Sequence, residues 1–403
     1  MKKLRVIEQS LRDYYVNAQS VITALLIGTI FFFRGRNYQH AICGDDRTLF
    51  DHAIGRSESV HAPCSDEWQL LHHAIQRQSI LGRFRFVDPF GLFDISNGYL
   101  WVIPRIITKA LSVGGSEYFT LRTFLFMSIA WTIITTCIAM LISRITSPYL
   151  GLMAALTIAI MPYSNLVMLA QINTITWPSV LIVIIVITTR QYPQSHLLQV
   201  FVCIFFALVT LSTIVSVIPI GYLLWLVCTR TAPPPLERRL VWVMGGSLAL
   251  QVLSYQSRGH NISPSKFLHE IPLIAYAFAP QFVREKILEP KTIVVNIILY
   301  GIPILLGIMI FILLRLGSQP ELRRQVRTAK HFFLISLFVI SMLIIGNGWL
   351  NSHYLFIPTA LFWLGVLLIC DAVAHNSSRF RMVPIAIVAV IFLIGLSGTY
   401  FVI

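Results

Sequence analysis

The sequence predicts an all-α integral membrane protein that forms one polytopic domain over residues 1–403. Of its 403 residues 56% are hydrophobic and 12% are charged, and the mean hydropathy is +0.75. These polar side chains are too few to cover the surface of a soluble globule, and we therefore expect lipid to cover the protein. In lipid every backbone polar group needs a partner within the chain, which leaves helices or closed barrels. The apolar runs are continuous rather than alternating, so they predict helices.

About eleven apolar runs approach the length of roughly 20 residues that a crossing needs. They are residues 17–33, 121–143, 147–165, 174–189, 197–212, 215–229, 239–256, 292–315, 331–347, 352–374 and 382–402. The stretch from Leu197 to Cys228 is too long for one crossing and contains Ser212, Ser216 and Pro219, so we divide it into two short helices. The first run lacks small residues at a cleavage position, so we interpret it as an uncleaved span.

The basic residues of the short connections predict a cytoplasmic N-terminus in a cytoplasmic (inner) membrane. On that side lie Arg144, Arg190, Arg230, Arg238, Arg239, Arg315, Arg323, Arg324, Arg327, Lys330, Arg379 and Arg381. The extracytoplasmic side then holds the long loop of residues 34–120 and the connections near residues 171–173, 257–290 and 347–353. The net charge of +14 fits this topology and an anionic ligand. It does not indicate nucleic-acid binding, because no basic helix is interleaved with aromatic residues.

The segment Tyr99–Leu111 leaves the topology open at one point. It is apolar, but it is short and contains Pro104, Arg105 and Lys109. We expect a helix that lies in the outer interface. The alternative counts it as a crossing and requires residues 197–228 to form a single helix; the long loop stays outside in both topologies.

The loop of residues 34–120 collects the acidic residues. Nine of the 17 carboxylates fall in it: Asp45, Asp46, Asp51, Glu58, Asp66, Glu67, Asp88, Asp94 and Glu117. An exposed loop gathers polar residues in any case, but as a set these carboxylates indicate a site. Cys43 and Cys64 lie in the same loop and are candidates for a disulfide in an oxidising compartment. A metal pair is the alternative, although no C-x-x-C spacing supports it.

Two acidic pairs are candidates for chemistry, Asp45–Asp46 and Asp66–Glu67. The second pair opens a segment in which Trp68, Leu71 and Ile75 share a helical face, which predicts an interfacial helix. Acid at a helix N-terminus also has a capping role. A carboxylate at the water boundary of the membrane is suited to act as a general base on a hydroxyl.

The first span, the long acidic outer loop with interfacial helices and the many later spans resemble the GT-C glycosyltransferases. The segments Asp66-Glu67-Trp68 and Asn97-Gly-Tyr99-Leu-Trp-Val-Ile-Pro-Arg105 are similar to the first-loop pattern of bacterial members. The resemblance implies an inverting enzyme that transfers a sugar from a polyprenyl-phosphate donor to a cell-envelope glycan or lipid acceptor outside the cytoplasm. It also implies that Asp66, with Glu67 beside it, is the catalytic base. Asp45–Asp46 is the rival pair, because many members keep their acidic pair near the first span.

A phosphate-bearing donor needs cations on the outer face, for which arginine is the best-suited side chain. Arg105 is the principal candidate, since an arginine within an apolar segment either snorkels or binds an anion. Further candidates for donor binding are Arg258, Lys266 and His353, and for sugar binding or stacking Asn97, Tyr99, Gln171, Asn173, Trp177 and Tyr354. Interfacial anchoring is an alternative role for Arg258, Tyr354 and Trp177.

Other enzyme signatures are absent, including G-x-S-x-G, H-E-x-x-H, a Gly-rich phosphate loop and a Cys/His metal pattern. No metal ligand is predicted, although a divalent cation remains compatible with the acidic pairs. Two other classes stay open: a transporter or flippase of a lipid-linked saccharide, and an envelope polysaccharide polymerase or acyltransferase. A transporter needs repeats and polar residues at mid-membrane, and the sequence has no visible repeat and few such residues.

Overall fold

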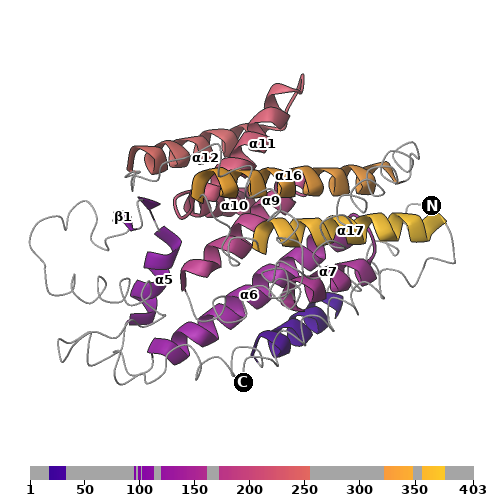
Figure 1. The fold of residues 1–403 in the computed structure, drawn as a ribbon, viewed down its shortest axis with the longest axis horizontal. Coiled ribbons are helices and arrows are strands. Elements are labelled where there is room, and N and C mark those ends of the chain that lie inside the picture. Colours follow the sequence, from indigo (N-terminus) through magenta and orange to yellow (C-terminus); the bar gives the residue numbers. More distant parts are fainter. Residues whose placement is uncertain are drawn as a thin grey trace, which may run out of the picture. The chain divides into compact units, whose positions relative to one another are not determined.

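The computed structural model of the protein is helical apart from one short ladder of two strands (Figure 1). It describes residues 18–32, 95–96, 99–100, 102–112, 119–160, 172–254, 322–347 and 356–376. The ladder pairs β1 (Ile95–Ser96) with β2 (Tyr99–Leu100) in antiparallel register, with Ile95 opposite Leu100. The helical fold class predicted from the sequence is confirmed for this part of the chain.

The helices follow the apolar runs closely. They are Ala18–Phe32, α5 (Val102–Ser112), α6 (Phe119–Ser143), α7 (Pro148–Ile160), η1 (Ile172–Ile175), α9 (Thr176–Thr189), α10 (His196–Thr210), η2 (Ile214–Ser216), α11 (Val217–Cys228), α12 (Pro235–Ser254), α16 (Arg323–Asn347) and α17 (Phe356–Asn376). Two of them, α6 and α17, contain stretches long and apolar enough to cross a membrane. The predicted spans 292–315 and 382–402 lie outside the described residues.

Two helices begin a full turn or more before the predicted apolar runs. Helix α12 starts at Pro235 rather than at residue 239, and α16 starts at Arg323 rather than at residue 331. The expected starts were wrong because hydropathy excludes charged first turns. In α16 those polar turns contain Gln325, which is buried and bonded to the neighbouring helix.

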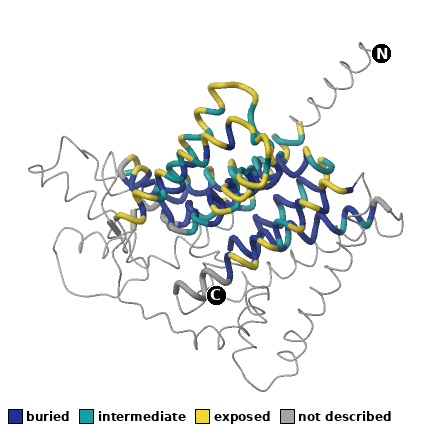
Figure 2. Tube along the Cα trace, turned by 90° about the horizontal axis from the view of Figure 1, so that it is seen from above, coloured by how far each residue is buried: buried dark blue, intermediate teal, exposed yellow. Residues whose placement is uncertain are grey.

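The described chain divides into two compact units. One comprises residues 1–30, 132–164 and 261–403, and the other residues 31–131 and 165–260. Exposed residues recur along the described helices (yellow in Figure 2). In both units many of these exposed residues are large and apolar, among them Leu25, Phe201, Trp242 and Leu337.

In the first unit, α16 and α17 pack as an antiparallel pair. Gln325 Nε2 donates to the Leu368 carbonyl at 2.8 Å and to Asp371 Oδ2 at 2.9 Å. Ser336 Oγ donates to the Pro358 carbonyl at 2.7 Å. The first bonds join the start of α16 to the end of α17, and the last joins the start of α17 to a later turn of α16, so the helices run in opposite directions.

The turn between α6 and α7 depends on a close approach at Gly151. A Cβ atom there would collide with the Ser143 side chain and would lie 2.5 Å from the Ala139 carbonyl oxygen. The turn also carries two hydroxyl bonds back to α6, from Ser143 Oγ to Ala139 O and from Thr146 Oγ1 to Ile142 O, both of 2.8 Å. Only glycine fits at this point of the turn without a shift of the backbone.

In the second unit, α10 and α11 form a hairpin. The end of α10 lies beside the start of α5, where the Val102 amide donates to the Leu211 carbonyl at 3.5 Å. The turn before α10 and the turn after α11 meet elsewhere, because Tyr192 lies beside Glu237 and Arg230 pairs with Glu237. One straight helix over residues 196–228 would place its two ends about 48 Å apart. The predicted division of this stretch is therefore confirmed, and the single-helix alternative is wrong.

The break in the hairpin has a local cause. Pro219 in the first turn of α11 cannot continue a preceding helix, and the freed backbone groups are bonded by hydroxyls. Ser212 Oγ donates to Leu208 O at 2.6 Å, and Ser216 Oγ donates to Thr213 O at 2.7 Å.

We predict that Gly151→Ala destabilises the protein by about 1–3 kcal/mol, because the added methyl group overpacks the α6–α7 turn against backbone atoms. The matched control is Gly245→Ala in α12, where an added Cβ meets no atom within 4 Å and helix propensity favours alanine by about 1 kcal/mol. Thermal unfolding of the purified protein in detergent measures the stability of both variants. Equal midpoints for Gly151→Ala and the wild type would contradict the packing assignment.

Candidate functional site

The candidate site is built on α5, whose two ends are bonded by other elements. The Ile103 amide donates to Ser212 Oγ at 2.8 Å, and the Val102 amide donates to the Leu211 carbonyl. At the other end, Arg122 NH1 of α6 donates to the Leu111 carbonyl at 2.8 Å. Helix termini carry backbone groups without intrahelical partners, so these three bonds fix the position and direction of α5.

Helix α5 is too short to cross a membrane. Its 11 residues extend for about 16 Å, roughly half of the hydrocarbon thickness. Val102, Arg105 and Thr108 are buried, whereas Ile106 is 39% exposed. The described length of α5 fits the predicted interfacial helix better than a full crossing of residues 99–111.

Arg105 lies in the second turn of α5 and is only 8% exposed. Burial of a charged side chain costs several kcal/mol unless polar or charged groups surround it. Arg105 belongs to the polar interior of this unit.

Buried hydroxyl and amide groups gather on the elements that pack around α5. Helix α5 packs on η1 and on the end of α10, and α12 packs on β2 and η2. The buried polar residues of these elements and the adjoining turns are Thr174, Thr176, Ser179, Thr210, Ser212, Thr213, Ser216 and Gln251. We call these residues, together with Arg105 and Thr108, the polar junction. Five of its hydroxyl groups, those of Thr108, Ser179, Thr210, Ser212 and Ser216, donate to backbone carbonyls, so the group that the junction offers to an anion is the Arg105 cation.

The structure places four of the residues predicted for the site. Tyr99 lies in β2, Arg105 in α5, Asn173 in η1 and Trp177 in the first turn of α9. It thereby brings the elements that carry Arg105 and Asn173 into contact. The other predicted site residues lie outside the described residues: Asp45, Asp46, Asp66, Glu67, Asn97, Gln171, Arg258, Lys266, His353 and Tyr354, with Cys43 and Cys64.

Ser212 and Arg122 were not predicted as parts of the site. Ser212 was noted only as a break between two helices, and Arg122 lies within the predicted span 121–143 without having been singled out. Ser212 meets its partner Ile103 across 109 residues of sequence, and no local pattern indicates such a pairing. The described cysteines, Cys137, Cys203, Cys228 and Cys370, are free thiols. Among the described residues, no group of three or more His, Cys, Asp or Glu is placed to hold a metal ion.

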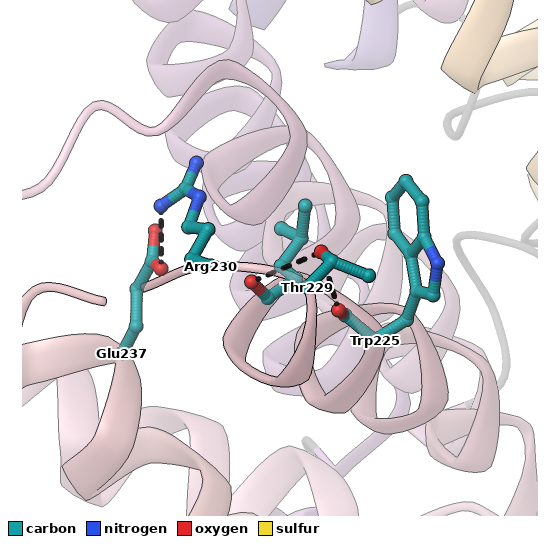
Figure 3. A network of polar contacts seen from close by, with 5 residues as sticks. Trp225, Thr229, Arg230 and Glu237 are labelled. Carbon is teal, nitrogen blue, oxygen red and sulfur yellow. Dashed lines mark hydrogen bonds and ion pairs between the residues drawn. The ribbon is translucent and has the colours of Figure 1, made fainter. Parts of the chain in front are cut away.

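A second polar cluster closes the turn between α11 and α12 (Figure 3). Arg230 NH1 pairs with Glu237 Oε2 at 2.8 Å, and Glu237 is completely buried. Glu237 lies in the first turn of α12, where the helix dipole favours a carboxylate. Thr229 Oγ1 donates to the Trp225 carbonyl at 2.8 Å and caps the end of α11. This cluster bonds the two ends of a stiff proline turn, so we assign it a structural role.

Tyr192 joins this cluster from the turn between α9 and α10. Burial and then the negative charge of Glu237 raise the pKa of the Tyr192 phenol far above its ordinary range. The phenol is therefore held neutral beside the carboxylate. It couples the two turns at this end of the helical hairpin.

No family model, no curated protein and no solved structure matches this chain.

We predict that Ser212→Ala frees the start of α5, because the Ile103 amide loses its acceptor at a cost of about 1–3 kcal/mol. Hydrogen–deuterium exchange of a peptide covering residues 102–112 should accelerate by about tenfold or more. Ser195→Ala is the control, because Ser195 precedes the same helix α10 and makes no side-chain cap bond. Unchanged exchange in α5 would show that Ser212 does not anchor it.

We predict that stability falls as the pH rises above about 10, and that Tyr192→Phe reduces this loss. The folded state holds the Tyr192 proton more tightly than the unfolded chain does. Above the pKa of the unfolded chain, unfolding therefore releases a proton, and the free energy of unfolding decreases with pH. Thermal midpoints between pH 8 and pH 11 measure the effect, with the wild type as the reference. An equal alkaline loss in Tyr192→Phe would refute the assignment.

Proposed function

We propose that this protein is a GT-C-like glycosyltransferase of the cytoplasmic membrane, with about eleven crossings and a cytoplasmic N-terminus. It transfers a sugar from a polyprenyl-phosphate donor to a glycan or lipid acceptor on the extracytoplasmic face. The proposal rests on the resemblance of the long acidic loop to that family, together with the burial of Arg105.

The burial of Arg105 in an anchored helix is the observation that carries the proposal furthest. Helix α5 lies in the C-terminal part of the acidic loop of residues 34–120, and both of its ends are bonded to other elements. A phosphate held by an arginine takes up two parallel hydrogen bonds, and a nearly dry site strengthens them. A cation fixed in this way is suited to a phosphate whose charge increases as the sugar leaves.

The reaction assigns separate roles to the acidic loop and to α5. A carboxylate, from Asp66 or from the Asp45–Asp46 pair, takes the proton of the acceptor hydroxyl. The acceptor oxygen then attacks the anomeric carbon, and the bond between that carbon and the phosphate oxygen breaks on the opposite face. The bonding electron pair leaves with the phosphate, whose added charge Arg105 stabilises. The configuration at the anomeric carbon is inverted.

Other residues have supporting roles in this proposal. Arg258, Lys266 and His353 supply further positive charge or hydrogen bonds to the donor phosphate. The polar and aromatic set of Asn97, Tyr99, Gln171, Asn173, Trp177 and Tyr354 binds the sugar or the isoprenoid near the interface. Glu67 supports Asp66, and a disulfide between Cys43 and Cys64 braces the acidic loop.

We predict that Arg105→Gln lowers sugar transfer by about 100-fold, and that Arg105→Lys retains more of it because the charge remains. A combined Asp45→Asn, Asp46→Asn and Asp66→Asn variant loses about 100-fold or more, as expected for a general base. The assay uses synthetic polyprenyl-phosphate sugars with a radiolabelled pentose or hexose, in proteoliposomes of the full chain.

The control is Asp51→Asn with Glu58→Gln, which removes charge from the same loop and leaves transfer near normal. A normal rate in the triple variant would rule out the proposed base. Movement of the intact donor across the bilayer without transfer would assign the chain to the transporters instead.

A further inference from the structure

One face of α12 carries a continuous exposed stripe. Its members recur every three or four residues, so they align along one side of the helix. The stripe comprises Arg238, Arg239, Trp242, Gly246, Ala249, Leu250 and Leu253, all exposed. Trp242 is 81% and Leu253 is 83% exposed, which is unusual for large apolar side chains in a packed helix.

The chemistry of the stripe changes in order along the helix. Two arginines come first, a tryptophan follows one turn later, a flat segment comes next, and leucines complete it. From Arg239 to Leu253 the helix rises about 21 Å, which is comparable to one bilayer leaflet with its headgroups. The order is that of a phospholipid: a charged headgroup, an interfacial zone and hydrocarbon.

The basic end of the stripe has no exposed acid next to it in the sequence. Glu237, the carboxylate in the same turn, is completely buried and paired with Arg230. Its charge is therefore compensated inside the protein, and Arg238 and Arg239 remain exposed as a positive pair. Such a pair at a helix end attracts lipid phosphate.

The middle of the stripe leaves room for a chain to lie against the helix. A Cβ atom added at Gly245 or Gly246 would meet no atom within 4 Å. Next to these glycines, Trp242 projects at one end and Leu250 at the other. Because these glycines carry no side chain, the helix surface is low between Trp242 and Leu250, and we call this stretch the lane.

We propose that this stripe of α12 binds an anionic glycerophospholipid, with the phosphate at Arg238 and Arg239, the glycerol region at Trp242 and an acyl chain over Gly246 and Ala249. The leaflet is the one that faces the start of α12, which the basic residues predict to be cytoplasmic. Charge complementarity selects the anionic lipid over a zwitterionic one. The site is independent of the proposed transfer reaction.

The experiment uses the full chain in phosphatidylcholine vesicles that contain a small fraction of brominated phosphatidylglycerol or brominated phosphatidylcholine. The difference in fluorescence quenching between wild type and Trp242→Phe isolates the signal of Trp242. We expect phosphatidylglycerol to bind at Trp242 about tenfold or more tightly than phosphatidylcholine, since each arginine contributes to the attraction. An Arg238→Gln, Arg239→Gln variant should bring this ratio close to one.

Two further variants sharpen the test. Arg323→Gln with Arg327→Gln removes two exposed arginines from α16 and should leave the ratio unchanged. Gly246→Leu fills the lane without a clash inside the chain and should weaken the binding of both lipids at Trp242.

A wild-type ratio near one, or a ratio unaffected by loss of Arg238 and Arg239, would overturn the proposal. Protection of Trp242 from both lipids, with chain dimers that Gly246→Leu dissociates, would assign the stripe to a second copy and also overturn it.

Discussion

The structure as a whole depends on the need of buried polar groups for partners within the protein, since only 12% of the residues are charged and the helices are mostly apolar beyond their first turns. The commonest solution is local: a serine or threonine hydroxyl donates to the carbonyl four residues earlier. Thr157 bonds Met153 at 2.8 Å, Thr188 bonds Ile184 at 2.7 Å, and Thr210 bonds Phe206 at 2.8 Å. With such a bond, a serine or threonine can lie buried in an apolar helix while its hydroxyl group keeps a hydrogen-bond partner.

The ends of helix α5 also carry polar backbone groups that need hydrogen-bond partners, but the partners come from other elements. The helix is short, and its first amides and last carbonyl lie among other elements. Ser212 in the turn after α10 and Arg122 in α6 bond them, so the break between α10 and α11 and the position of Arg105 belong to one structural unit. We therefore expect a substitution in the α10–α11 hairpin to alter the position of Arg105, the cation on which the proposed reaction depends.

The two described carboxylates, Glu237 and Asp371, are both buried near helix ends and both have polar partners. Arg230 pairs with Glu237, and Gln325 donates to Asp371. Each connects chain segments, and neither lies in α5 or its adjoining turns. The carboxylates proposed as the general base, Asp66 and the Asp45–Asp46 pair, lie outside the described residues.

The sequence by itself determined the helical class, the break in residues 197–228 and most helix bounds, because apolar length and helix-breaking residues are local properties. The predicted run 121–143 corresponds to the helix Phe119–Ser143, and the predicted run 352–374 corresponds to the helix Phe356–Asn376. It also singled out Arg105 as a residue of interest. Only the tertiary structure decided that Arg105 is buried and that Ser212 holds the start of α5. Those outcomes depend on which helices pack together, and a bond across 109 residues leaves no trace in a local pattern.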